Sequence, residues 1–509
     1  MKVLFVTGKL AFDGVEEIVK EIKKNIDADV LNLNYPVASL MTVDYIAERL
    51  KRMKLKDYDY IILPGLVSGD AKKIEEITKI KTFKGTEDYR DIPLVIDALE
   101  KGISLSSIYP ADVIIGKIKE ENVEEEIDKI EKEGNYAFEI NGVKIPRFSP
   151  PFRIFIELDA SKDEEFLIEE AERVKEYVDV IVLGFPNGHE NVEEIRNKVK
   201  KLSDLGYKVA IDSASVNELI EGAKAGADFI FNLNEENLED LEVIKNKAFI
   251  IAPLSTENRA EVTYEIYKKA KDKGFEKLIL DPVLSPPMFG LVDSIIEYKK
   301  LRKMTDAPIL MGILNATELI DADSVGVNAL LTGIAGEIGI GNLLVMEHNK
   351  TRWSSYETKI ASKMISLAIK KKTLPKDLGL DLLILKDKKR MKREKEDDKK
   401  DDNLIEINEH IEPKYMDKGF VRIYLEKDKI DLEWLGRDLI RIRGSDGLSI
   451  GRKLVELINV NSEHALYIGY ELAKAEIALQ LDKNYIQDRP LFKRGYISLN
   501  TDYSRREKR

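Results

Sequence analysis

The chain has 509 residues, no cysteine and a formal net charge of −12. Without cysteine there can be no disulfide, iron–sulfur cluster, thiolate zinc site or cysteine nucleophile, and the acidic balance argues against general nucleic-acid binding. The four histidines do not stand at metal-ligand spacing, which makes a transition-metal enzyme an unfavoured interpretation. The sequence has no run of about 18 apolar residues, the length needed to span a membrane, so we expect a cytoplasmic protein. Charged residues reach 34% and are rich in Lys and Glu, a profile typical of proteins from hot environments.

Residues 1–150 alternate apolar strands with amphipathic helices, which predicts a doubly wound α/β domain of the flavodoxin or Rossmann type. The turn Gly65–Asp70 would either bind an anion or close a loop. Since no Gly-x-Gly-x-x-Gly or Walker pattern is present, the loop interpretation is favoured. The expected strands are Lys2–Thr7, Asp29–Asn32 and Tyr58–Leu63, and the expected helices are Asp13–Ile26 and Val43–Met53.

Residues 151–375 repeat the strand–helix alternation more strictly, after a predicted hairpin at Asn141-Gly142 and a break at Ser149-Pro150-Pro151. Eight strands in about 220 residues predict a compact (β/α)₈ TIM barrel. The expected strands are Arg153–Leu158, Val178–Leu183, Lys208–Asp212, Phe229–Asn232, Ala248–Pro253, Lys277–Asp281, Pro308–Leu314 and Leu343–Glu347.

The remainder divides into a charged linker over residues 376–402 and a small α+β domain over residues 403–509. Residues 386–402 contain almost nothing to bury, which favours a solvated linker over a basic-tail function. A hairpin of Phe420–Leu425 and Ile430–Trp434 should precede two helices, Gly451–Asn459 and Ser462–Asp482. The alternating Arg441 and Arg443, followed by glycines, could form a phosphate site, but a charged edge strand and turn is the favoured interpretation.

Four of the barrel strands end in polar side chains suited to a flat heterocycle: Asp212, Asn232, Asp281 and Asn315. Strand carboxyl ends form the active-site face of a (β/α)₈ barrel. Carboxylates accept pairs of N–H donors and carboxamides both donate and accept, so this set suits a pterin or purine-like ring better than a sugar or a metal. The alternative for any single position is a helix N-cap, which Asp212 would provide for the helix that follows it.

The barrel segment resembles the pterin-binding family, which includes dihydropteroate synthases and corrinoid-dependent methyltetrahydrofolate methyltransferases. The resemblance covers roughly residues 152–370, and as a whole the chain is similar to the archaeal proteins labelled dihydropteroate synthase-related. It is sharpest in Tyr207–Ser213, in Glu221–Asn232 and in Leu278–Pro282, which match the Ile-Asp-Thr, Gly-Ala-Asp and Leu-Asp-Pro segments of synthases. Carried over by residue, the resemblance implies that Asp212, Asn232 and Asp281 contact the pterin.

Two loops depart from the synthase pattern. Glu157–Lys162 replaces the Asn-x-Thr-x-Asp-Ser-Phe loop, and Gly184–His189 replaces Ser-Thr-Arg-Pro. Those loops in synthases hold Mg²⁺-diphosphate and shape the arylamine site. The strand end around Asn315 resembles the Gly-x-Ser-Asn of the methyltransferases, as does Asn328 in the segment after it.

The last strand keeps part of the synthase pattern, because His348 stands where the Arg-x-His of synthases has its histidine. Lys350 and Arg352 follow closely, and the resemblance implies that all three face a diphosphate, together with Mg²⁺. A purely structural histidine is the alternative for His348.

The resemblance implies three hypotheses. The first is a dihydropteroate synthase-like transferase that joins a hydroxymethyl-dihydropterin diphosphate to an arylamine in folate or methanopterin-type cofactor synthesis, with Asn315 in place of the family's lysine. The second is methyl transfer between a tetrahydropterin and a corrinoid carried by a partner protein, because the chain lacks the Asp-x-His-x-x-Gly corrinoid motif. The third is a non-catalytic pterin-binding protein or scaffold. Barrels of this family commonly form homodimers.

Overall fold

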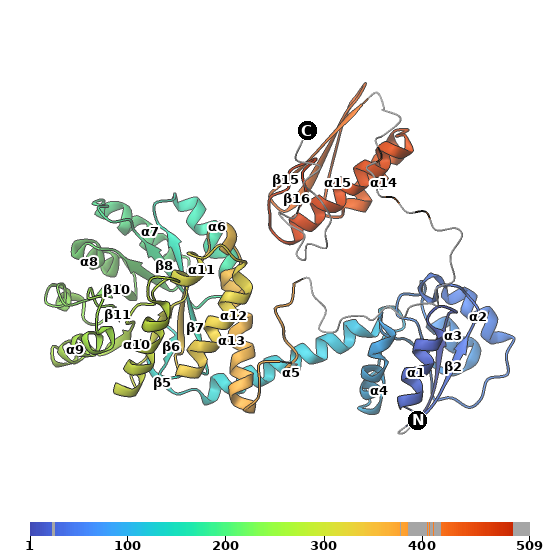
Figure 1. The fold of residues 1–509 in the computed structure, drawn as a ribbon, viewed down its shortest axis with the longest axis horizontal. Helices are drawn as coiled ribbons and strands as arrows, with labels where there is room; N and C mark the ends of the chain where they lie inside the picture. Colours follow the sequence, from blue (N-terminus) through green and yellow to red (C-terminus); the bar gives the residue numbers. More distant parts are fainter. Residues whose placement is uncertain are drawn as a thin grey trace. The chain divides into compact units, whose positions relative to one another are not determined.

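The computed structural model describes residues 1–22, 26–376, 378–384, 405, 407, 411 and 419–491, and their side chains except those of residues 117–122 (Figure 1). The chain forms two compact units, Met1–Lys386 and Asp387–Arg509. Most of the predicted linker, residues 376–402, therefore lies outside the described residues. None of the helices among the described residues is long and apolar enough to cross a membrane.

A parallel four-stranded sheet of order β2-β1-β3-β4 opens the first unit and confirms the predicted doubly wound domain. Two apolar clusters cover its faces, one around Phe5 and Val95 and the other around Leu4 and Ile46. The fourth strand was not predicted. The elements are β1 (Lys2–Thr7), α1 (Phe12–Ile22), β2 (Asp27–Asn32), η1 (Ala38–Leu40), α2 (Val43–Lys51), β3 (Tyr60–Leu63), α3 (Lys72–Thr78), β4 (Lys81–Lys84), η2 (Tyr89–Asp91) and α4 (Ile92–Glu100).

A 23-residue helix, α5 (Ala111–Glu133), and the hairpin of β5 (Tyr136–Ile140) and β6 (Val143–Pro146) lead into the barrel. Helix α5 packs on the last barrel helix, α13 (Ser354–Lys371), where Glu126 pairs with Lys371 at 2.7 Å. Inside the amino end of the barrel, Val143 and Ile145 of the hairpin pack against Phe155 and its neighbours. The hairpin predicted as a domain exit therefore also closes one end of the barrel core.

Eight parallel strands form the predicted (β/α)₈ barrel, in the order β12-β11-β10-β9-β8-β7-β14-β13. The bridge between Leu280 and Ile309 joins the two outer strands of that order, so the sheet closes on itself. Helices surround the strands (Figure 1). The strands are β7 (Arg153–Asp159), β8 (Val180–Gly184), β9 (Val209–Asp212), β10 (Phe229–Leu233), β11 (Ala248–Ile251), β12 (Lys277–Leu280), β13 (Leu310–Gly312) and β14 (Asn342–Met346). The helices before α13 are α6 (Glu164–Val174), α7 (Val192–Asp204), α8 (Val216–Ala225), η3 (Asp240–Ile244), α9 (Arg259–Asp272), α10 (Leu291–Met304), α11 (Leu314–Thr317), α12 (Ser324–Ile338) and η4 (Asn349–Thr351).

The second unit is an antiparallel three-stranded sheet with helices packed on one face, which confirms the predicted small α+β domain. Alternate residues such as Ile430, Leu432 and Trp434 face the helices and form its core. The predicted hairpin is followed by a third strand. The elements are β15 (Phe420–Glu426), β16 (Lys429–Leu435), β17 (Leu439–Gly444), α14 (Gly447–Leu457) and α15 (Ser462–Gln480).

Candidate functional site

Strand alternation sends a ring of polar side chains into the carboxyl end of the barrel. Phe155, Ala210 and Ile279 belong to the apolar cluster inside the barrel. Side chains two residues apart on a strand share a face, so the positions that follow, Glu157, Asp212 and Asp281, also point inward. We call this end of the barrel the mouth and define it by Glu157, Asp212, Asn232, Asp281 and Asn315.

Asp212 and Asn232 form the first pair of the mouth. Asp212 lies opposite Phe231 in the β9–β10 register, and on the other side of β10 the β10–β11 register shifts between Phe231 and Leu233. Such an irregularity re-aims the intervening side chain, and the Asn232 Nδ2 donates to Asp212 Oδ1 at 3.4 Å. Burial raises the pKa of Asp212 to about 6. Helix α8 has Ser215 rather than Asp212 at its N-cap, so the capping alternative does not hold.

Asp281 and Asn315 form the second pair. Asp281 is 8% exposed, and its Oδ1 accepts the Val283 N–H at 2.8 Å and the hydroxyl of Tyr298. Burial raises the pKa of Asp281 to about 6, although Tyr298, the Val283 N–H and Arg259 act in the opposite direction. A Cβ placed on Gly312 would lie 3.7 Å from Asn315 Nδ2 and 3.9 Å from Asp281 Oδ2. The two polar atoms therefore flank the same glycine.

The expected position of Asn315 at a strand end was wrong. Strand β13 ends at Gly312, and Asn315 lies in the short helix α11 that follows. Its Nδ2 donates to the Leu284 carbonyl at 2.9 Å, in the loop after Asp281. The asparagine thus reaches the second pair from a helix, while Asp212 and Asn232 reach the first pair from β9 and β10, on the other side of β11.

Sequence reasoning did not assign Glu157 to the site, although this residue belongs to the expected strand Arg153–Leu158 as well as to the divergent segment Glu157–Lys162. Glu157 lies within β7, and a Cβ on Gly184 of the next strand would collide with its Oε1, so only glycine leaves room for this rotamer. Burial raises the pKa of Glu157 to about 8, helped by the charges of Asp212, Glu318 and Asp159. The signal that could have found it is the two-residue step from Phe155 along the same strand.

The predicted diphosphate ligands already have partners within the chain. His348 is the N-cap of η4, and its imidazole Nε2 lies 3.1 Å from Asn349 Nδ2. Lys350 donates to the Ile320 carbonyl and pairs with Asp321 at 3.6 Å. Arg352 pairs with Glu170 of α6 at 2.7 Å. Among the described residues, none of the three hydrogen-bonds to the polar groups of the mouth, and their role stays a prediction.

The other two predicted anion sites are also held by internal bonds. At Gly65–Asp70, the Asp70 carboxylate accepts the Lys72 N–H at 3.0 Å, as expected of a structured loop. On the sheet of the second unit, Arg441 pairs with Glu433 at 3.1 Å and Arg443 pairs with Asp431 at 2.8 Å. These contacts favour the charged edge strand over a phosphate site.

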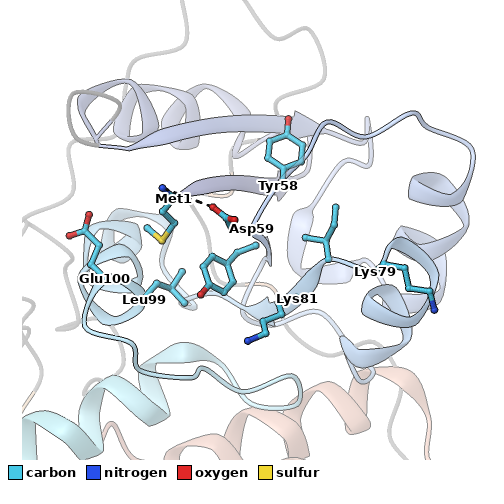
Figure 2. Close-up of a pocket in the computed structure, with 9 residues that line it drawn as sticks. Met1, Tyr58, Asp59, Lys79, Lys81, Leu99 and Glu100 are labelled. Atoms are coloured by element: carbon cyan, nitrogen blue, oxygen red, sulfur yellow. Dashed lines mark ion pairs between the residues drawn. The ribbon is translucent and has the colours of Figure 1, made fainter.

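Two surface depressions lie away from the mouth. One, of about 650 Å³, is lined by residues such as Met1, Asp59 and Leu99 at the amino ends of β1 and β3 (Figure 2). The other, of about 580 Å³, lies outside the barrel wall between Val192 and Ile220. In open α/β sheets ligands bind outside the carboxyl ends of the strands, so the first depression is on the unfavoured side. Within the part of the chain that the structure describes, no cluster of His, Asp and Glu is arranged to hold a metal ion.

Comparisons with known proteins match different parts of the chain. A model described as a family of unknown function, DUF6513, matches residues 1–87, and one described as PterinBD-DUF4346 matches residues 416–488. The second match carries a pterin-binding domain designation and lies on the C-terminal unit, outside the barrel.

Solved structures that cover the barrel include dihydropteroate synthase from Yersinia pestis, at 16% identity over 45% of this chain and 97% of that chain, with a TM-score of 0.37. A truncated 3-deoxy-D-arabino-heptulosonate 7-phosphate synthase from Thermotoga maritima matches at 17% identity over 49% of this chain and 95% of that chain, with a TM-score of 0.36. Likenesses this low carry no argument about the reaction, and they do not separate the two kinds of enzyme.

One relative matches along almost the whole length. The uncharacterized protein MJ0107 of Methanocaldococcus jannaschii is 34% identical over 528 aligned positions, which cover 97% of this chain and 99% of the relative. The chain therefore belongs to the same family as MJ0107.

Proposed function

We propose that the barrel binds a reduced pterin at its mouth and transfers a group to or from it. The observation that carries the proposal is the pair of carboxyl–carboxamide couples at one end of the barrel, Asp212 with Asn232 and Asp281 with Asn315. The resemblance of the barrel segment to the pterin-binding family supports the same ligand. The family matched by residues 416–488 carries a pterin-binding designation, which supports a pterin as a ligand of the protein but does not locate it in the barrel.

The chemistry of the mouth fits a pterin head group. A pterin ring presents an exocyclic amine and ring N–H groups beside ring acceptors, all in one plane. Carboxylates satisfy the donors, and carboxamides serve either kind of group. Hydrogen bonds that involve an ion contribute roughly 1.5–3 kcal/mol each, so three such groups would support micromolar recognition.

The first candidate reaction is the synthase type. An arylamine nitrogen would attack the methylene carbon of a hydroxymethyl-dihydropterin diphosphate; the new C–N bond forms as the C–O bond breaks, the diphosphate leaves with the electron pair, and the amine loses a proton. Such a site works by stabilising the departing charge. His348, Lys350 and Arg352 would then have to exchange their partners within the chain for the anion, and Mg²⁺ would accompany the diphosphate.

The second candidate is methyl transfer from a tetrahydropterin nitrogen to a corrinoid on a partner protein, and one observation favours it. Glu157 has a pKa of about 8, so it is mostly protonated at neutral pH and can donate a proton in the mouth. A ring nitrogen that is protonated leaves more readily when the N–CH₃ bond breaks and the electron pair returns to nitrogen. The nearby carboxylates of Glu318 and Asp159, which help to raise the pKa of Glu157, would also repel a diphosphate that arrived without a cation.

A diphosphate-release assay, together with a pterin-binding titration, separates the synthase reaction from the other two hypotheses. The purified full-length chain would be incubated with a dihydropterin diphosphate, Mg²⁺ and an arylamine, and diphosphate release would be measured. The first candidate predicts release that Asp281→Asn reduces and Asp228→Asn does not, because Asp228 lies at the amino end of β10 and accepts from Asn141 at 2.8 Å. Pterin binding without release would remove the synthase reaction and leave methyl transfer or a non-catalytic role. No binding of any reduced pterin would overturn the proposal. A homodimer also stays a prediction.

A further inference from the structure

Tyr298 is a fully buried residue of α10 whose hydroxyl contacts Asp281, one of the residues of the mouth. It is 0% exposed and is one of the largest buried side chains of the chain. Phenylalanine would supply the same ring, so packing alone does not explain the hydroxyl. A buried tyrosine O–H needs a partner, and this one donates to Asp281 Oδ1.

We propose that Tyr298 is a positioning residue, which turns Asp281 so that a single carboxylate oxygen, Oδ2, faces the ligand. This inference rests on the proposed pterin site and specifies how Asp281 would take part in it. Oδ1 already accepts two hydrogen bonds, from Tyr298 and from the Val283 N–H at 2.8 Å. Among the described residues, no donor hydrogen-bonds to Oδ2, which lies on the side of Gly312 and Asn315.

The two carboxylates of the mouth consequently have different tasks. Asp281 offers one oxygen, next to the Asn315 carboxamide. Among the described residues, the only donor to Asp212 is Asn232, at 3.4 Å from Oδ1. Each carboxylate oxygen can accept more than one hydrogen bond, so both can still accept from a ligand. The two parallel N–H donors on the pterin edge therefore belong on Asp212, and Asp281 accepts one donor further along the ring. Asp281 and Asn315 together would favour a ring that places a donor and an acceptor side by side over a ring that places two acceptors there.

The hydroxyl also sets the charge of Asp281. Burial raises the pKa of this carboxyl, and the Tyr298 hydroxyl lowers it by stabilising the ionised form. Loss of the hydroxyl would raise the pKa further, so that Asp281 would be protonated over more of the neutral range and would accept less well. Arg259 does not replace the tyrosine as a donor, because its guanidinium donates to the Val283 carbonyl at 2.8 Å and to Ser285 at 2.9 Å.

The test is a calorimetric titration of the full-length chain with hydroxymethyl-dihydropterin, repeated between about pH 5 and pH 8. Tyr298→Phe should weaken binding about tenfold at neutral pH, the effect of one hydrogen bond to a charged group, and should move the pH midpoint of binding upward. The matched control is Tyr136→Phe, which removes a hydroxyl bonded to Glu131 at 2.8 Å at the other end of the barrel and should leave both quantities unchanged. An unchanged affinity and midpoint in Tyr298→Phe would overturn the proposal.

A second variant keeps the test decisive if Tyr298→Phe does not fold. Asp281→Asn retains the tyrosine and should remove the part of the pH dependence that Asp281 causes; a profile identical to that of the wild type would contradict the proposal. Where both variants fold, the double variant should bind no more weakly than Asp281→Asn alone, because the tyrosine acts through the aspartate. Fully additive losses would contradict it.

One further readout separates this inference from the proposed function. Carboxyl ¹³C NMR follows the titration of Asp281 without any ligand, with Asp281→Asn used to assign its signal. If the wild type binds no pterin, the proposed function fails. A higher Asp281 midpoint in Tyr298→Phe would then still support the positioning contact, and an unchanged midpoint would reject it.

Discussion

The two ends of the barrel are built from the same eight strands but use them differently. At the amino end, Val143 and Ile145 of the β5–β6 hairpin pack against Phe155 inside the barrel. Two residues further along β7, the inward position is occupied by Glu157. One step of the strand period thus separates apolar packing from a set of polar groups with few partners. This division agrees with the general division of labour in TIM barrels, in which the amino-terminal face supplies stability and the carboxyl-terminal face supplies chemistry.

The hydrogen bonds of the polar side chains differ between the two ends of the barrel in the same way. At the amino end, Arg153 makes two hydrogen bonds to Glu131 at 2.9 and 2.8 Å, and Asp179 accepts the Ile154 N–H at 2.8 Å. At the mouth, counting the described residues alone, Asp212 accepts one long contact and Asp281 Oδ2 accepts no hydrogen bond. Buried polar groups are normally paired, so those that are left open mark the end of the barrel where a ligand would complete them.

The largest expected effect is on stability, from the amino end. Phe155→Ala removes a fully buried ring whose centroid lies 5.3 Å from that of Phe229, and should lower the free energy of unfolding by about 3–5 kcal/mol. Chemical denaturation measures the loss. Pterin affinity, measured where the variant is still folded, should change little. A large loss of affinity with unchanged stability would contradict the division between the two ends.

Glu157→Gln should have an effect on stability of similar size and the opposite sign. The folded-state pKa of Glu157, about 8, lies above its usual value, so the folded protein binds an extra proton between about pH 4.5 and pH 8. This carboxyl therefore lowers stability progressively as the pH rises through that window, and the loss is complete above it. The glutamine variant should be about 4–5 kcal/mol more stable than the wild type at about pH 9 and similar to it at about pH 4. Parallel stability curves for the two proteins would refute the raised pKa.

Removal of one mouth carboxylate should weaken pterin binding about tenfold. Asp281→Asn and Asp212→Asn each lose one charged hydrogen bond, which corresponds to about 1.4 kcal/mol. Titration with a reduced pterin measures the change. The matched control at the amino end, Asp228→Asn, should bind as the wild type does. Equal losses in all three variants would indicate a general structural effect rather than a ligand contact.

Acidification should also weaken pterin binding by the wild type, because it neutralises the carboxylates that the substitutions remove. Asp212 and Asp281 both have a pKa of about 6 and accept hydrogen bonds from the ligand best when they are ionised. Pterin affinity should therefore be full above about pH 7 and should fall as the pH drops through 6. The contribution of Glu157 to the free energy of unfolding changes in the opposite direction, because it increases as the pH falls. Binding that is constant from about pH 5 to pH 8 would show that neither carboxylate contacts the ligand.

The smallest expected effect comes from Gly184→Ala. The added methyl group would collide with the end of the Glu157 side chain, which can rotate away, so the free energy of unfolding should change by less than about 1 kcal/mol. The displaced carboxyl would reach more water, and its pKa should fall toward the usual range. Carboxyl NMR would detect that fall. An unchanged Glu157 pKa would show that this rotamer does not depend on the glycine.

Sequence patterns predicted the architecture and the strand ends that carry Asp212, Asn232 and Asp281, because strand period and strand order determine which end of the barrel a residue reaches. They failed where the chain leaves the regular period. Strand β13 ends at Gly312 and the backbone turns into α11, so Asn315 was assigned to the wrong element. The strand period from Phe155 could have pointed to Glu157, but the room that Gly184 of the neighbouring strand leaves for its rotamer has no signal in the local sequence.

The predicted anion ligands show contacts that sequence patterns do not contain. Arg352 stands near the predicted last strand, but its partner Glu170 is 182 residues away in α6. Lys350 is held by the Ile320 carbonyl, 30 residues earlier. No local pattern contains such pairings, and only the folded arrangement reveals that these cations already have partners.

The most direct test of the account is whether a reduced pterin binds at the mouth. Calorimetric titration of the full-length chain with hydroxymethyl-dihydropterin, alongside the Asp212→Asn and Asp228→Asn variants, measures this in one experiment. The account predicts micromolar binding that weakens about tenfold in Asp212→Asn and is unchanged in Asp228→Asn. Equal affinity in all three proteins, or no binding by the wild type, would contradict it.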